Sequence, residues 1–181
     1  MRQWFWGIAA AVVALDQATK LLVVSLLPEG HPSVALIPRL LYLTHVRNPG
    51  TAFGLLPRGG IVLSLIAVAA IVGIVVYWRR LRKRPDPPPA LLVWGLALPL
   101  GGAVGNLLDR MRAGAVIDFI DLRFWPVFNV ADSAITVGAC LIGWYFLFVA
   151  DRPRRAAEAG KSTPLPPGSE GIASPSDPAH E

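Results

Sequence analysis

The sequence predicts an α-helical integral membrane protein with four transmembrane helices and a small extracytoplasmic β hairpin or sheet after the first helix. The chain of 181 residues is 54% hydrophobic and only 16% charged, and its mean hydropathy of +0.51 is far from that of a soluble domain. Four apolar runs approach the roughly 20 residues that cross about 30 Å of hydrocarbon. Helices are expected in these runs because isolated strands would leave backbone groups unpaired in lipid.

The apolar runs lie at about residues 4–27, 61–78, 90–108 and 134–150. The first run could be mistaken for a secretory signal peptide, because Arg2 precedes an apolar stretch. The apolar stretch resumes after Lys20, however, and no small-x-small cleavage site follows it. We therefore predict a retained transmembrane helix and a single membrane domain over residues 1–151.

The segments between the runs predict a hairpin on one side of the membrane and basic anchors on the other. Ser33–Val46 holds alternating and β-branched residues interrupted by Pro38, which is typical of a short hairpin. Basic residues crowd the link between the second and third runs and follow the fourth run: Arg79, Arg80, Arg82, Lys83, Arg84, Arg152, Arg154 and Arg155. The positive-inside rule predicts that these residues and both termini are cytoplasmic, and that the loops 28–60 and 109–132 are outside.

Composition also limits the partners and cofactors. The net charge of +5 is explained by this topology and by anionic lipid, so no nucleic-acid partner is expected. Residues 152–181 are rich in Pro, Ser, Gly and Ala, which predicts a disordered cytoplasmic tail. Neither a zinc-binding His-Glu-x-x-His pattern nor a phosphate-binding Gly-Lys-Ser/Thr loop occurs. No metal ion or cofactor is therefore expected.

Polar residues inside the first and third runs mark their outer halves. Asp16 and Lys20 share one helix face at a spacing that favours an ion pair. This pair could tie the helix to its neighbours or contact a substrate directly. Gly101, Gly102 and Gly105 form a seam where another helix or a substrate backbone could approach closely.

The end of the third run carries a polar face that helix packing alone does not explain. Gly102, Asn106, Asp109 and Arg110 follow one another at helical spacing near the predicted outer boundary. An amide, an acid and an arginine on one face indicate a functional site or a structural ion pair.

Two aspartates, Asp118 and Asp132, lie between the third and fourth runs. A carboxylate at a membrane boundary is costly to desolvate, so a pair brought together there is a functional-site hypothesis. The apolar neighbours of Asp118 favour its protonated form. Asp132 precedes the fourth run, so it could be only a helix N-cap, and the helix dipole would favour its ionised form.

Five polar segments follow in order along the predicted spans. They are Asp16–Lys20, Asn48–Gly54, Gly101–Arg110, Val116–Phe119 and Phe128–Ala134. Taken alone, the second is a simple turn signal. Together, over roughly residues 5–150, the five segments closely resemble the bacterial lipoprotein signal peptidases, the signal peptidase II family.

This resemblance implies a cofactor-free aspartic endopeptidase of the bacterial plasma membrane. Its expected partners are the bilayer and a diacylglyceryl-modified prolipoprotein, which it would cut just before the lipidated cysteine, acting as a monomer. The resemblance also implies that Asp118 and Asp132 are the catalytic dyad and that Asp16 and Lys20 organise the site. The residues implied to shape or support the substrate site are Asn48, Gly50, Gly102, Asn106, Arg110, Asn129 and Ala131.

Two other classes of protein are compatible with polar residues near a membrane. A small transporter or proton channel would spread ionisable groups across the whole membrane depth, whereas the second run and the inner halves of the third and fourth offer none. A structural membrane subunit would use the polar residues for helix packing, and it would tolerate replacement of Asp118 by asparagine.

Overall fold

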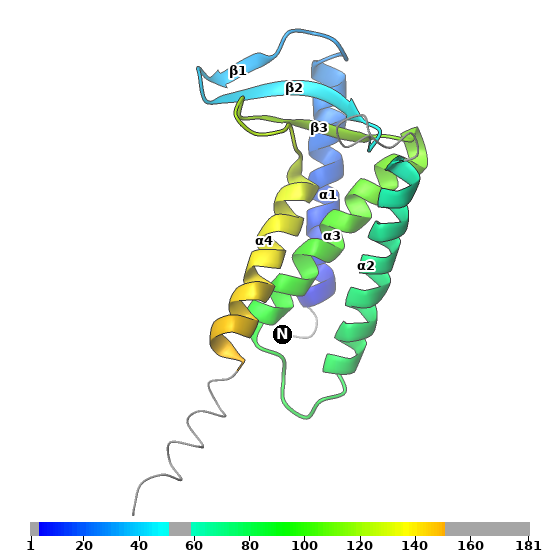
Figure 1. The fold of residues 1–181 in the computed structure, drawn as a ribbon, viewed down its shortest axis with the longest axis vertical. Helices are drawn as coiled ribbons and strands as arrows, with labels where there is room; N and C mark the ends of the chain where they lie inside the picture. Colours follow the sequence, from blue (N-terminus) through cyan, green and yellow to red (C-terminus); the bar gives the residue numbers. More distant parts are fainter. Residues whose placement is uncertain (1–3, 51–58, 151–181) are drawn as a thin grey trace, which may run out of the picture.

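Four long helices run side by side and meet a small β-sheet at one end (Figure 1). The computed structural model describes residues 4–50 and 59–150. The helices are α1 (Trp4–Leu26), α2 (Gly59–Leu81), α3 (Ala90–Ala113) and α4 (Val130–Trp144), and α4 continues into a π-helical segment, η2 (Tyr145–Val149). All four are long and apolar enough to cross a membrane. The predicted fold class, a four-helix membrane protein with a small sheet, is confirmed.

The helices run further than the apolar sequence indicates. The third helix continues to Ala113, and the fourth begins at Val130 instead of near residue 134. Apolar runs report only the hydrocarbon-spanning part, whereas a helix can continue among polar side chains beyond it. Two predicted segments, the second half of the Asn48–Gly54 turn and the tail at 152–181, lie outside the described residues.

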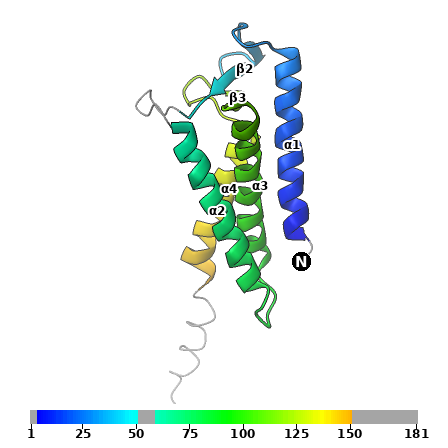
Figure 2. The same cartoon turned by 90° about the vertical axis from the view of Figure 1, so that its right-hand side faces the viewer.

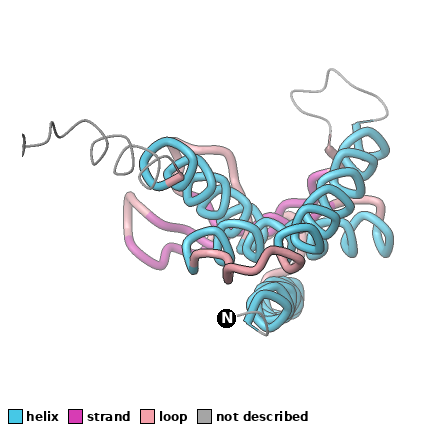
Figure 3. Tube along the Cα trace, turned by 90° about the horizontal axis from the view of Figure 1, so that it is seen from below, coloured by secondary structure: helices cyan, strands magenta, loops and turns pink. Residues whose placement is uncertain are grey.

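Helix α3 is the central element, since it contacts α1, α2 and α4. Helix α1 stands to one side of the other three, as the two rotated views show (Figures 2 and 3). The predicted glycine seam lies where neighbouring helices approach α3 closely. A Cβ at Gly101 would meet the carbonyl oxygen of Ala9 at 2.7 Å, and one at Gly102 would collide with the carbonyl oxygen of Ala131. Neighbouring helices therefore fill the space beside the seam.

The sheet has the strand order β1-β2-β3 and is antiparallel. Strands β1 (Val34–Ile37) and β2 (Leu41–Asn48) form the predicted hairpin. Strand β3 (Val116–Asp121) was not predicted; it pairs with β2 and sets Val46 opposite Asp118. Strand β3, which contains Asp118, lies at the same end of the bundle as the start of α4 (Figure 1).

The other end of the bundle is held by an apolar cluster. The rings of Phe5 and Trp78 stack with centroids 4.1 Å apart, and both side chains are fully buried. Leu81 and Leu92 join them, so the cluster links α1, α2 and α3. Polar contacts at the sheet end and apolar contacts at the opposite end thus fix the helices relative to one another.

Candidate active site

Asp118 and Asp132 are joined through one side chain, that of Asn129. The Asn129 amide nitrogen donates to Asp118 Oδ1 at 2.7 Å, and its carbonyl oxygen accepts the backbone N–H of Asp132 at 2.9 Å. Asn129 is fully buried, and Asp118 is 3% exposed. An amide that bonds both partners at once fixes their separation, because it cannot rotate without losing one bond.

Asn129 is also the N-cap of α4. The alternative that Asp132 is only the N-cap of this helix is therefore wrong. Asp132 is the third helical residue, and its Oδ2 accepts the backbone N–H of Asn129 at 3.2 Å, which completes a capping box. The fourth helix starts earlier than its apolar run, so Asp132 lies within the first turn. Its carboxylate therefore has a fixed orientation at the positive end of the helix.

Asn106 on α3 holds the second oxygen of Asp132. Its amide nitrogen donates to Asp132 Oδ1 at 2.8 Å, and its oxygen accepts from Lys20 Nζ at 2.9 Å and from Asn129 at 3.1 Å. An ammonium group can only donate. Lys20 therefore fixes which end of the Asn106 amide faces Asp132.

The predicted pair of Asp16 and Lys20 is present as part of a buried triad. Lys20 Nζ lies 2.8 Å from Asp16 Oδ2 and 2.7 Å from Asp109 Oδ2, and all three side chains are nearly inaccessible to solvent. Asp109 thus forms an ion pair with Lys20 on α1. A buried charge needs such compensation, since desolvation is costly.

The triad connects three separate elements to the carboxyl pair. Asp16 Oδ1 accepts the backbone N–H of Ala131 at 3.0 Å, which holds the first turn of α4. Asp109 Oδ2 accepts the N–H of Ile117 at 3.4 Å, next to Asp118 in β3. Gln17, which the sequence did not single out, donates to Asp109 Oδ1 at 2.9 Å. In the sequence, only its position beside Asp16 indicates a role for Gln17, because its contact partner Asp109 lies 92 residues away.

Asn48 contacts Oδ2 of Asp118 and also holds the backbone of Gly50. Its amide nitrogen donates to Asp118 Oδ2 at 3.0 Å, and its oxygen accepts the N–H of Gly50 at 2.9 Å. Gly50 has a φ of 80°, a conformation that favours glycine. The backbone at residues 48–50 is therefore tied directly to Asp118.

Arg110 lies near the pair without bonding to it. It lines an apolar cavity of about 270 Å³ between α2, α3 and α4, together with Asn106 and Asp132. Its Nε is buried and has no hydrogen-bond partner among the described residues. An unsatisfied buried donor is costly, so this nitrogen is suited to a group that enters the cavity. A second cavity of about 330 Å³ reaches Asp132 from the other side, where Phe124 and Trp125 are exposed.

The electrostatic environment separates Asp118 from the other acid of β3. Burial raises the pKa of Asp118 from 3.8 to about 6; the amide of Asn48 opposes this rise and the charge of Asp132 adds to it. The N–H of Arg123 and the hydroxyl of Thr44 instead lower the pKa of Asp121, despite partial desolvation. Within the described parts of the chain, no group of three His, Cys, Asp or Glu residues could hold a metal ion.

The helices and the site together define the class: a polytopic membrane protein whose polar centre is a pair of aspartates bridged by an asparagine, beside an apolar cavity. The sequence profile described as "Signal peptidase (SPase) II" matches residues 8–148. The chain belongs to the signal peptidase II family and is a peptidase.

Relatives and solved structures agree with this assignment. The chain is 45% identical to a lipoprotein signal peptidase of Pelotomaculum thermopropionicum over 80% of its length and 92% of the relative. It is 43% identical to one of Moorella thermoacetica over 83% of its length and 97% of the relative. A solved structure described as a bacterial membrane enzyme, at 1.9 Å by the in meso method, superposes with a TM-score of 0.69 and 31% identity, covering 79% of this chain and 92% of the other.

Proposed function

We propose that this protein removes signal peptides from diacylglyceryl-modified prolipoproteins, cutting just before the lipidated cysteine, with Asp118 and Asp132 as its catalytic pair. The observation that carries the proposal is the bridge of Asn129 between the two acids. Asp132 also lines the apolar cavity of about 270 Å³. The names of the relatives give the substrate class.

The two carboxyl groups take different roles in this mechanism. Asp118, whose pKa is raised to about 6, holds the proton and donates it to the oxygen of the scissile carbonyl. Asp132 accepts hydrogen bonds at a helix start, which suits the charged partner. It removes a proton from water as the water oxygen attacks the carbonyl carbon. As the tetrahedral intermediate collapses, the C–N bond breaks, Asp132 gives the proton that it took from water to the leaving amine, and a hydroxyl of the intermediate returns a proton to Asp118. The pair titrates as a unit.

The remaining polar residues position the substrate. Arg110 lines the cavity beside Asp132, where its buried Nε can donate to an extended peptide backbone. Asn48 supports the site by holding Asp118. The apolar cavity between α2, α3 and α4 suits the hydrophobic part of a lipidated signal peptide. Asp16 and Lys20 act indirectly, by holding Ala131 and Asn106 in place.

The proposed orientation places this site near the outer face of the plasma membrane, with both termini in the cytoplasm. The basic residues of the link between α2 and α3 lie at the end of the bundle opposite the sheet (Figure 1), and the positive-inside rule assigns that end to the cytoplasm. A lipidated substrate with acyl chains in the outer leaflet would then meet the acids at the interface, where water is available. The protein is proposed to act as a monomer.

Cleavage of a diacylglyceryl-modified prolipoprotein by the purified protein tests the proposal. The product should begin at the lipidated cysteine, as mass spectrometry would show. Asp118→Asn and Asp132→Asn should each abolish cleavage and leave an inserted, folded protein. Asp121→Asn is the matched control, because Asp121 is a buried acid of the same strand whose contacts are Thr44 and Arg123.

The outcomes separate the parts of the proposal. Near wild-type cleavage by Asp118→Asn would refute the catalytic pair. Equal loss in Asp121→Asn would mean that activity follows the integrity of the sheet instead of the acid chemistry. Cleavage of an unlipidated precursor at the same rate would refute the substrate class.

A further inference from the structure

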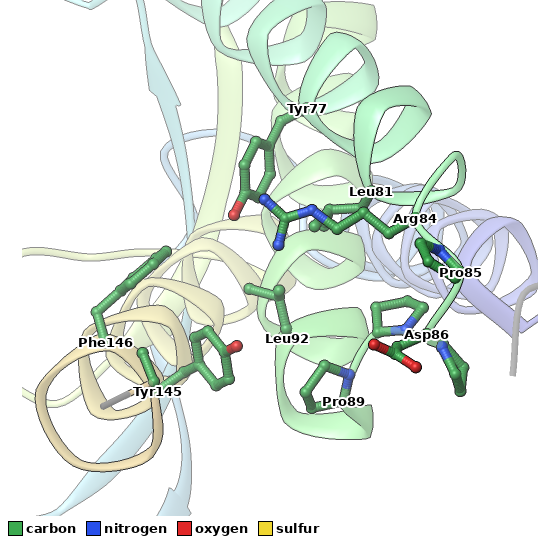
Figure 4. Close-up of a pocket in the computed structure, with 12 residues that line it drawn as sticks. Tyr77, Leu81, Arg84, Pro85, Asp86, Pro89, Leu92, Tyr145 and Phe146 are labelled. Carbon is green, nitrogen blue, oxygen red and sulfur yellow. The ribbon is translucent and has the colours of Figure 1, made fainter. Parts of the chain in front are cut away.

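A large cavity lies at the end of the bundle opposite the active site. It has a volume of about 510 Å³ and is formed by the end of α2, the link to α3, the start of α3 and segment η2 (Figure 4). This size is within the range of about 300–1,000 Å³ that is typical of small-molecule sites. Nothing in the proposed peptidase mechanism uses it.

One part of the cavity wall is polar. Arg84 extends over the cavity from the link, toward the side where Tyr77 lies, and Tyr145 contributes a hydroxyl group from η2 (Figure 4). Arginine binds phosphate with high geometric specificity, and phenolic hydroxyls can donate to its oxygens. Asp86 also lines the cavity, but it is the single acid among positions 79–89, which carry five basic residues. The electrostatic potential at this end therefore favours an anion.

The other part of the wall is apolar. Leu81, Leu92 and Phe146 line it, and Phe146 is 51% exposed on the outer surface of the bundle. A cavity that is cationic at its rim and apolar along a surface facing lipid matches a molecule with both characters. The prolines of the link, Pro85 and Pro87–Pro89, stiffen the rim. A stiff rim reduces the entropy lost on binding.

We propose that this cavity binds the phosphodiester headgroup of an anionic phospholipid of the cytoplasmic leaflet. Arg84, with Tyr77 and Tyr145, holds the phosphate, and the acyl chains lie against Leu92 and Phe146. Basic pockets between membrane helices on the cytoplasmic side are known to take such headgroups, and anionic lipids are concentrated in that leaflet. The bound lipid would connect α2, α3 and η2, which all contribute to the cavity wall.

Native mass spectrometry of the full-length protein in detergent tests this site. The probes are phosphatidylglycerol and phosphatidylcholine with identical acyl chains, titrated at equal concentrations. The wild-type protein should retain phosphatidylglycerol about fivefold better, as expected for about one cationic contact. Arg84→Gln should lose this preference. Arg82→Gln is the matched control, because it removes the same charge from the same segment but does not line the cavity.

Each alternative occupant has its own outcome. If Arg82→Gln loses as much binding as Arg84→Gln, only the general surface charge matters and the site is refuted. If excess inorganic phosphate displaces the lipid completely, the cavity takes a free anion and the lipid assignment is wrong. If deletion of residues 152–181 raises lipid binding severalfold, the chain's own segment after Ala150 is the occupant. Unchanged binding after that deletion, with loss in Arg84→Gln and in Tyr77→Phe, supports the lipid.

Discussion

Replacing Asp118 by asparagine should remove a pH-dependent loss of stability as well as the proposed activity. The pKa of Asp118 is raised from 3.8 to about 6, mainly because its carboxyl is buried. The folded protein therefore holds this proton more tightly than the unfolded chain does. Stability contributed by the proton is fully present below about pH 4 and is lost as the pH rises through about 6.

The magnitude follows from the size of the pKa shift. Each pKa unit corresponds to about 1.4 kcal/mol. A rise from 3.8 to about 6 therefore lowers the free energy of unfolding by about 3 kcal/mol when Asp118 is fully ionised. The same relation gives a cost of about 1.6 kcal/mol at pH 5. The free energy of unfolding of the wild type should thus fall by about 1.4 kcal/mol relative to Asp118→Asn between pH 5 and pH 8.

Comparing the two pH values also removes the effect of a hydrogen-bond mismatch that the Asp118→Asn substitution introduces. Asn48 and Asn129 both donate to Asp118, so an asparagine there would set its own NH₂ group against one of these donors. That mismatch costs on the order of 1–3 kcal/mol. It is independent of pH, because none of the three amides titrates, and it cancels in the difference between the two pH values.

Reversible unfolding in mixed micelles, followed by tryptophan fluorescence, would measure the effect. Asp121→Asn is the control, since the N–H of Arg123 lowers the pKa of Asp121 and this acid is ionised throughout the range from pH 5 to 8. Its difference from the wild type should be flat over that range. An equally flat difference for Asp118→Asn would refute the raised pKa and, with it, the assignment of the proton to Asp118.

Three further perturbations and one pH profile test the arrangement of the site. The kcat/KM of the wild type should fall as the pH rises through about 6, because the proton on Asp118 is lost; a rate that is flat to pH 8 would contradict the assignment. Asn129→Ala should lower kcat at least about 100-fold and destabilise the protein by about 1 kcal/mol, since it removes both the bridge and the cap; a drop in stability with normal kcat would leave it only a cap. Lys20→Met should destabilise the protein by about 3–5 kcal/mol in micelle unfolding, because two buried carboxylates lose their counter-charge. Gly105→Ala should lower the free energy of unfolding by about 1–3 kcal/mol, because the added Cβ would lie 2.6 Å from Oδ2 of Asp16. Gly73→Ala is the control and should leave stability unchanged, because its Cβ would meet no atom within 4 Å.

Local sequence patterns predicted much of the fold. The four helices follow from apolar length, and the hairpin follows from β-branched residues around a turn. The ion pair of Asp16 and Lys20 follows from helical spacing. These features depend on residues close together in the chain, so periodicity and composition are sufficient to find them.

The connections between helices could not be predicted in the same way. Strand β3 exists because it pairs with β2, which lies about 70 residues earlier in the chain. The six residues of β3 do not by themselves specify that partner. Likewise, Asp109 has its neighbour Arg110 as an obvious partner in sequence, yet it contacts Lys20 on another helix. The resemblance to the signal peptidase II family supplied the residues of the site. It did not supply the dual role of Asn129 as N-cap and bridge.

The contact between Asp16 and Ala131 joins residues 115 positions apart, at the beginning and near the end of the membrane domain. Asn129 and Asp132 take their positions only when the first turn of α4 has formed against α1 and α3. A nascent chain that has inserted its first three helices therefore carries Asp118 but has no partner for it. If Asp118 and Asp132 are the catalytic pair, as proposed, insertion of the last helix completes the site, and an incomplete chain in the membrane is unable to cut its neighbours.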